Sequence, residues 1–304
     1  MASTNRSALI TKLLRVVRKR YTAVTPVDRP VLEQLIFAGL LENAPHEPAE
    51  EAFAALLDQF FDWNEVRVST VRELAEVMRR LPAPEQAANR VKNNLQNVFE
   101  SRYTFDLEDL KRLKLGQAEQ KLEKIAGVSK FCVAYVTQVA LGGHSIPLDE
   151  GTLGALEVVG IIDAKAKAKG VVPGLERAVP KAKGTEVASL IHLLGADFFK
   201  NPYAPALHKI LLEINPDAKE NLPKRPTKKQ LAEQAAAEEA ARQAKLAKQK
   251  KAVARAAAKT AQAAASKKKA AKKVATVKKA AKTKKSATKK KAKTARRPAK
   301  RKPR

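Results

Sequence analysis

A short turn and an acidic residue further along the chain are the features of this sequence that could do chemistry. The turn occupies residues 125–129 (IAGVS) and joins two stretches whose apolar residues recur with helical periodicity. Gly127 can adopt a positive φ and has no side chain, so the turn can present backbone N–H groups outward. Together with the N-terminal end of the second helix, these amides are expected to bind an anion such as a DNA phosphate.

Asp149 lies 22 residues after Gly127, in a Pro-Leu-Asp sequence that opens a third predicted helix. The amides and the dipole of a helix N-terminus would hold its carboxylate in the ionised form. Such a carboxylate could face a bound substrate, stabilise developing positive charge and orient or deprotonate a water. An Asp directly before a helix is also an ordinary N-cap, so the residues by themselves leave both roles open.

Basic side chains flank the turn on both sides along the chain. The simplest alternative to an anion site is a plain connection between two helices, with Gly127 as the C-cap. The lysines around the turn favour contact with the phosphate backbone instead. The expected DNA-binding residues are Lys121, Lys124, Gly127, Val128, Ser129 and Lys130.

The elements that position these residues are predicted to be helices. Four further stretches carry apolar side chains at helical spacing, and no alternating run is long enough to predict a sheet. Prolines mark several helix ends, and Ser69 is predicted as a cap. We therefore predict an all-α body of about ten helices at typical lengths. The stripes are Val31, Leu35, Ile36 and Leu40; Phe53, Leu56, Leu57, Phe60 and Phe61; Val71, Leu74, Val77, Met78 and Leu81; and Val91, Leu95, Val98 and Phe99.

The positive charge of the chain is concentrated in its last 81 residues. Residues 224–304 contain 31 Lys and Arg but three acids, whereas residues 1–223 contain 29 basic and 28 acidic residues. No aromatic residue follows Tyr203, so this tail is predicted to be disordered or partly helical. It resembles the C-terminal domains of linker histones and should bind duplex DNA through counterion release. A solubilising appendage or a polycation for RNA or membranes remains the alternative.

Other classes of protein are disfavoured by composition. Cys132 is the single cysteine, so we predict no disulfide and no cysteine-based metal cluster, and an intracellular protein. The four histidines show no metal-ligand spacing, and no apolar run approaches the ~20 residues of a membrane span. Residues 1–20 are basic and amphipathic, as in a transit peptide. We favour a first helix that packs on the body through Leu9, Leu13, Val16 and Val17.

The turn, Lys130 and residues 142–149 (GGHSIPLD) together resemble the helix-hairpin-helix DNA glycosylases, the endonuclease III-like proteins. Members carry a Leu-Pro-Gly-Val-Gly-like turn, of which this chain keeps the first Gly and replaces the second by Ser129. The hydroxyl of Ser129 can still cap the next helix. Residues 142–149 are closest to the monofunctional adenine-glycosylase branch. The resemblance covers roughly residues 30–214 and implies a two-lobed helical body with Asp149 as the catalytic carboxylate.

Two departures from the family limit the implied chemistry. Bifunctional members place a nucleophilic Lys where this chain has Phe131, and Lys130 points about 100° away around the helix. We therefore expect no Lys-based lyase step. Many relatives also hold a four-Cys iron–sulfur cluster, which this chain lacks, so we expect no cofactor and no metal. Phe198 and Phe199 are expected to fill that space as core.

What remains is either a monofunctional glycosylase for base-excision repair or a non-catalytic, nucleoid-associated DNA-binding protein on the same fold. The first would extrude a nucleotide and hydrolyse its glycosidic bond with Asp149. Glu42, Asn43, Phe131 and Tyr135 are the candidate pocket residues, although the first two could simply end a helix and Tyr135 could be core. Trp63 is either a wedge between bases or a core anchor.

Three regions are expected along the chain, and their partner is double-stranded DNA. Residues 1–25 are predicted as a basic amphipathic helix, residues 26–223 as the glycosylase-like domain and residues 224–304 as the DNA-binding tail. Within the domain, residues 164–184 are predicted as an exposed basic loop that borders the DNA-binding face. We expect a monomer without membrane contact, in the bacterial cytoplasm or nucleoid, or in the nucleus of a eukaryote.

Overall fold

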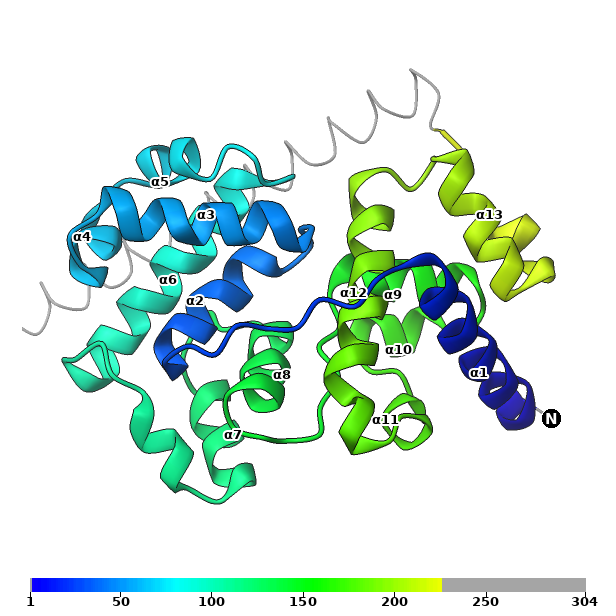
Figure 1. Ribbon diagram of the computed structural model, residues 1–304, viewed down its shortest axis with the longest axis horizontal. Helices are drawn as coiled ribbons and strands as arrows, with labels where there is room; N and C mark the ends of the chain where they lie inside the picture. The colour runs from blue at the N-terminus through cyan, green and yellow to red at the C-terminus, as the bar shows by residue number, and fades with distance from the viewer. Residues whose placement is uncertain (1, 226–304) are drawn as a thin grey trace, which may run out of the picture. The chain divides into compact units, whose positions relative to one another are not determined.

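The computed structural model describes residues 2–225, and within this range the chain forms thirteen α-helices, three short 3-10 helices and no strand (Figure 1). The all-α prediction is confirmed. The helices outnumber the expected ten because several are only one or two turns long. Of the tail predicted for residues 224–304, residues 226–304 lie outside the described residues. The α-helices are α1 (Ala2–Arg20), α2 (Val31–Leu41), α3 (His46–Gln59), α4 (Trp63–Val68), α5 (Val71–Val77), α6 (Pro84–Arg102), α7 (Leu115–Glu123), α8 (Lys130–Val139), α9 (Glu150–Val158), α10 (Ala164–Lys169), α11 (Leu175–Ala178), α12 (Gly184–Lys200) and α13 (Pro205–Ile214), and the 3-10 helices are η1 (Glu108–Arg112), η2 (Lys181–Lys183) and η3 (Pro216–Asn221).

A first hydrophobic core lies among α2 to α8, with α2 at its centre. Ten of the eleven residues of α2 are buried, because the sequence VLEQLIFAGLL is apolar on nearly every face. Helices α6 and α8 both pack against α2. The second helix of the predicted hairpin is therefore fixed directly to the most buried helix of this lobe.

A second core combines the beginning of the chain with its later helices. The side chains of Leu13, Val16 and Val17 from α1 are buried among apolar residues of α9, α12 and α13. Helix α1 therefore packs on the second core through one apolar face. Figure 1 shows how residues 21–30 then run from α1 to α2, so the first lobe is inserted between two parts of the second. The two cores confirm the predicted two-lobed body.

Helices α9 and α12 of the second lobe touch backbone to backbone. A Cβ added at Gly151 would lie 2.2 Å from the carbonyl oxygen of Gly195, and one added at Gly195 would lie 2.1 Å from Thr152 Oγ1. Only glycine permits such an approach. The Phe198 ring packs on Gly154 and on the second core, as predicted for a core residue. The crossing brings the middle of α12 against the start of α9.

Ser69 is a cap, as predicted, and it is the C-cap of α4. The N-cap of α5 is the next residue, Thr70, whose hydroxyl and the Glu73 carboxylate form a complete capping box. One local prediction is wrong. Leu57 and Phe61 are 52% and 96% exposed rather than core residues. Phe61 leaves the apolar stripe because α3 ends at Gln59 and the chain then turns into an extended conformation.

Candidate nucleic-acid interface and the Asp149 network

The turn between α7 and α8 has the backbone conformation that the sequence predicts. Gly127 adopts φ +84°, and the Ser129 hydroxyl accepts a hydrogen bond from the Cys132 amide at 3.1 Å, which caps α8. The Val128 amide is used within the turn, where it donates to the Ile125 carbonyl at 3.2 Å. Within the described residues, the amides of Gly127, Ser129 and Lys130 have no protein acceptor. These three amides form the candidate anion site. The Val128 amide is already hydrogen-bonded and is not part of it.

The three lysines around the turn differ in their surroundings. Lys124 is exposed, and Lys121 lies 3.7 Å from the Asp109 carboxylate. Lys130 Nζ donates to the Lys169 carbonyl at 2.8 Å. This bond satisfies a backbone acceptor at the C-terminal end of α10. Lys130 therefore ties the hairpin to the second lobe, whereas Lys124 is free to meet a phosphate.

Asp149 is the N-cap of α9, and its carboxylate is fully enclosed. Oδ1 accepts from the Thr152 amide at 2.7 Å, and Oδ2 accepts from the Asn43 amide at 3.2 Å. His192 Nδ1 lies 3.1 Å from the same Oδ2, and the Asp149 side chain is 0% exposed. The prediction that this carboxylate faces a bound substrate is wrong in position, because helices from both lobes cover it.

His192 on α12 completes the arrangement that we call the Asp149 network (Asp149, Asn43, Ala44, Thr152 and His192). Its Nε2 lies 2.9 Å from the Ala44 carbonyl. Both ring nitrogens thus lie near oxygen atoms of the protein, those of Asp149 and Ala44. Burial raises the pKa of Asp149, but the hydrogen bond and charge of His192 and the Thr152 amide lower the pKa by more. The net pKa of the carboxyl lies below its ordinary value.

Asn43 joins the two lobes by hydrogen bonds. It is buried with φ 63°, a left-handed conformation that Asn tolerates better than most residues. Its Oδ1 accepts from the Gly151 amide at 3.2 Å, while its own amide donates to Asp149. The connection between α2 and α3 is therefore hydrogen-bonded to the start of α9 through backbone and side chain.

Glu42 is the C-cap of α2 and contacts the hairpin. Its carboxylate accepts from the Ser129 hydroxyl at 2.8 Å and lies 3.5 Å from Arg90 Nε. Burial raises the pKa of this carboxyl, and Arg90 and Ser129 offset only part of the increase. Burial and Glu42 also raise the pKa of the neighbouring Cys132 thiol to about 12. Glu42 thus supports the cap of α8.

Phe131 and Tyr135 meet in the core. Their rings stack with centroids 6.2 Å apart, and the Phe131 ring lies 5.5 Å from that of His192. They border a cavity of about 30 Å³ between the two lobes, which is room for a water molecule but not for a base. The candidate pocket is therefore closed, and its four residues do not share one wall. Trp63 packs beside Phe53 as a partly buried core anchor.

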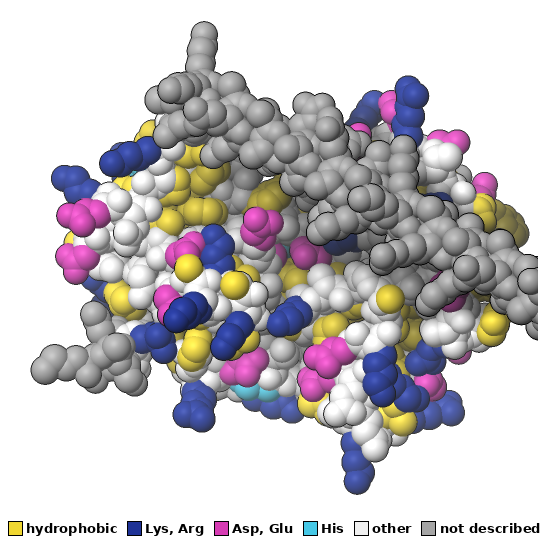
Figure 2. Space-filling model, turned by 180° about the vertical axis from the view of Figure 1, so that it is seen from behind, with side chains coloured by type: hydrophobic (Ala, Val, Ile, Leu, Met, Phe, Trp, Pro, Cys, Tyr) yellow, Lys and Arg dark blue, Asp and Glu magenta, His cyan; other side chains and the backbone are white. Residues whose placement is uncertain are grey.

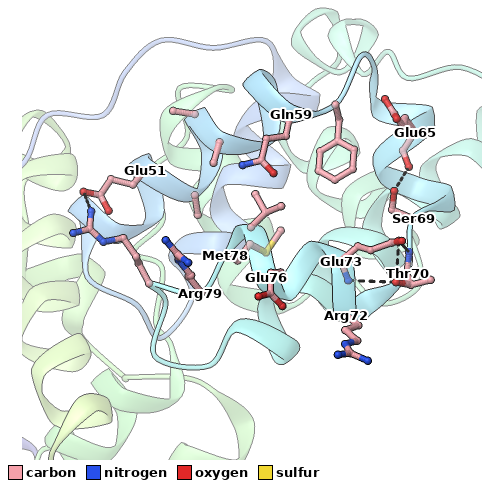
Figure 3. Close-up of a pocket in the computed structure, with 16 residues that line it drawn as sticks. Glu51, Gln59, Glu65, Ser69, Thr70, Arg72, Glu73, Glu76, Met78 and Arg79 are labelled. Carbon is pink, nitrogen blue, oxygen red and sulfur yellow. Dashed lines mark hydrogen bonds and ion pairs between the residues drawn. The ribbon is translucent and has the colours of Figure 1, made fainter.

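A large hollow lies elsewhere, between α3, α4 and α5, with a volume of about 1270 Å³ (Figure 3). Charged side chains of both signs surround it, and Glu51 pairs with Arg80 on its edge. None of the residues predicted to act on DNA lines this hollow. Within residues 2–225, no three side chains are placed to hold a metal ion. Among the helices of this range, none combines the length and the apolar character of a membrane span.

Sequence reasoning missed His192. The residue stands in the apolar stripe of α12, between Ile191 and Leu194, and a histidine there is ordinarily a core residue. Its partner Asp149 is 43 positions away. The one feature of the sequence that could have pointed to His192 is its position as a titratable residue within an apolar stripe. Such a residue needs a partner, but the sequence does not say which one.

No protein-family model matches the chain, and no curated protein matches it. Several solved structures align with it. A trapped endonuclease III–DNA covalent intermediate is 15% identical over 73% of this chain and 99% of that chain, with a TM-score of 0.47. A thermostable thymine-DNA glycosylase is 16% identical over 67% and 91%, with a TM-score of 0.45. An H. pylori 3-methyladenine DNA glycosylase bound to 1,N6-ethenoadenine is 15% identical over 72% and 99%, with a TM-score of 0.37. These are proteins of the class that the turn resembles, at similarities too low to bear on activity.

Proposed function

We propose that this chain is a DNA-binding protein that does not excise bases. The observation that carries the proposal is the enclosed Asp149 carboxylate, which has no exposed surface and three polar neighbours. Cleavage of an N-glycosidic bond builds positive charge on the sugar, and a stabilising carboxylate has to lie beside that charge. A carboxylate already hydrogen-bonded inside the protein does not meet this condition.

The cost of freeing Asp149 supports the same conclusion. The carboxylate would have to leave His192 and the Asn43 amide, and so separate the two lobes at this point. Separating a buried, hydrogen-bonded group from its partners costs about 1–3 kcal/mol. Because each 1.4 kcal/mol is a factor of ten, this slows any excision by roughly 5- to 150-fold. The Phe131 ring packs on His192, with ring centroids 5.5 Å apart, and would also have to move.

DNA binding is supported by two separate features of the chain. The hairpin turn offers the amides of Gly127, Ser129 and Lys130 beside the exposed Lys124. Amides at a helix N-terminus are well suited to a phosphate. Residues 224–304 add 31 basic residues against three acids, a composition that binds polyanions through counterion release. The tail would hold the body near the duplex and raise its effective concentration there.

The test is to incubate the full-length protein with a panel of duplexes that carry damaged or mismatched bases. Complex formation and base release, detected as alkali-labile sites, are measured on the same samples. We expect binding to every duplex and release from none.

Two asparagine variants give this test a matched pair. Asp149→Asn removes the enclosed carboxylate, and Asp163→Asn removes an exposed N-cap that accepts from Ala166 at 2.7 Å on α10. Base release by the unmodified chain would overturn the proposal, and release that survives in the Asp163 variant but disappears in the Asp149 variant would assign the reaction to Asp149. Absence of DNA binding by the unmodified chain would overturn it as well.

A further inference from the structure

Residues 164–183, which we call the basic segment, carry a surplus of positive charge. Helix α1 is also basic, but its Arg18, Lys19 and Arg20 are paired with Glu186 and Glu213. The segment contains six Lys and Arg and one acid, Glu176. The prediction of a loop is wrong in part, because the segment folds into α10, α11 and η2. Among the described residues, Lys167 is the only one of the six with an ion-pair partner, Glu157 at 2.7 Å. The others are exposed: Lys165, Lys169, Arg177, Lys181 and Lys183.

The basic segment is held in place and is attached to the hairpin. Its apolar residues Val172, Leu175 and Val179 are buried in the second core. Lys130, the first residue of α8, donates to the Lys169 carbonyl at 2.8 Å. His144, in the connection after α8, lies with Nε2 3.0 Å from the Glu176 carbonyl. The exposed cations therefore sit on a fixed surface that continues from the hairpin.

The opposite charge gathers on another part of the body. Residues 46–80, which form α3 to α5, contain eight acids and four arginines. Residues 1–223 as a whole are nearly neutral, so the described body has a charge asymmetry rather than a net charge. The face drawn in Figure 2 shows Lys and Arg interspersed with Asp and Glu, so no single sign covers it. A polyanion near this body would be attracted to the basic segment and repelled by α3 to α5.

We propose that the basic segment is a second contact surface for the DNA backbone, continuous with the hairpin turn. This inference rests on the proposed function, because it assumes that the body meets DNA. Five of its six cations are lysines, which act as point charges toward phosphates and carry little base specificity. The segment orients the body on the duplex, independently of DNA sequence, with α3 to α5 directed away.

The experiment uses the full-length protein and places a DNA-cleaving chelate on single introduced cysteines. Lys169→Cys and Lys181→Cys report on the basic segment, and Arg72→Cys on α5 is the control. The native Cys132 is buried with a raised pKa, so it does not compete for the thiol reagent. We expect strand cleavage from positions 169 and 181 at least tenfold above that from position 72.

A second measurement separates this surface from the tail. Replacing Lys165, Lys169, Lys181 and Lys183 by Gln should reduce the slope of log K against log salt by about 0.9 for each phosphate that the variant no longer neutralises. Arg72→Gln with Arg79→Gln should leave the slope unchanged. Equal cleavage from positions 72, 169 and 181, or an unchanged slope in the quadruple variant, overturns this inference while DNA binding stands. A full-length chain that binds no DNA overturns the proposed function itself.

Discussion

The N-terminal ends of α8 and α9 are capped in the same way but have different surroundings. Each begins with a polar cap, Ser129 or Asp149, whose side chain accepts from an amide three residues later. At α8 the amides of the exposed turn stay unbonded, while at α9 both lobes close over the cap. Helix ends have the same intrinsic affinity for anions. What they bind depends on which elements of the fold lie against them.

Removing His192 should have the largest effect on stability, because it disrupts the enclosed cap at the start of α9. His192→Leu leaves the buried Asp149 carboxylate without one of its three polar neighbours, and we expect a loss of about 3 kcal/mol in unfolding free energy. Thermal and urea denaturation measure this loss. The matched control is His208→Leu, which removes a ring bonded to the Pro202 carbonyl but to no carboxylate. Similar losses in the two variants would show that the Asp149 network adds no stability.

Substitution at the close helix crossing should rank second. Gly195→Ala places a Cβ 2.1 Å from Thr152 Oγ1, so α9 and α12 must separate, at a cost of about 1–3 kcal/mol. Gly116→Ala in α7 meets nothing within 4 Å and should stabilise the protein by up to about 1 kcal/mol. Opposite signs in denaturation experiments are the expected result. A neutral Gly195 variant would mean that the crossing can loosen freely.

The pH dependence of stability sharpens the comparison further. The pKa of Asp149 is lower in the folded protein than its ordinary value, so the unfolded chain binds its proton first as pH falls. Its contribution to stability is fully present above the ordinary carboxyl pKa and is lost as pH falls through the folded pKa. The stability difference between wild type and Asp149→Asn should therefore shrink between about pH 5 and pH 2. A difference that stays constant over this range would contradict the lowered pKa.

The smallest predicted effect on stability comes from a substitution in the exposed turn before α8. Gly127→Ala forces an L-residue to φ +84° and should cost about 1–2 kcal/mol of stability. It should also displace the turn amides and lower DNA affinity severalfold. Gly142→Ala imposes similar strain at φ +64°, beyond the C-terminal end of α8. If both variants lose DNA affinity equally in a filter-binding or anisotropy titration, the turn does not touch the DNA.

The limits of sequence reasoning in this protein follow from distance along the chain. The turn, the cap at Ser129 and the buried face of α1 were predictable because each depends on residues within a few positions. The enclosure of Asp149 was not, because its partners Asn43 and His192 lie 106 and 43 positions away. The prediction that Phe61 belongs to a buried stripe was wrong for another reason. The apolar residues keep their helical spacing beyond Gln59, but α3 ends there. Local pattern gives the element, and contacts between distant segments decide which polar groups reach solvent.

The path of residues 21–30 from α1 to α2 has a consequence for synthesis on the ribosome. The first lobe is built from contiguous sequence, residues 31–141, and can collapse as soon as it emerges. Helix α1 is translated before this lobe, whereas α12 and α13, which cover its apolar face, are translated after it. The apolar face of α1 therefore stays uncovered in the nascent chain until nearly all of the folded part has been translated.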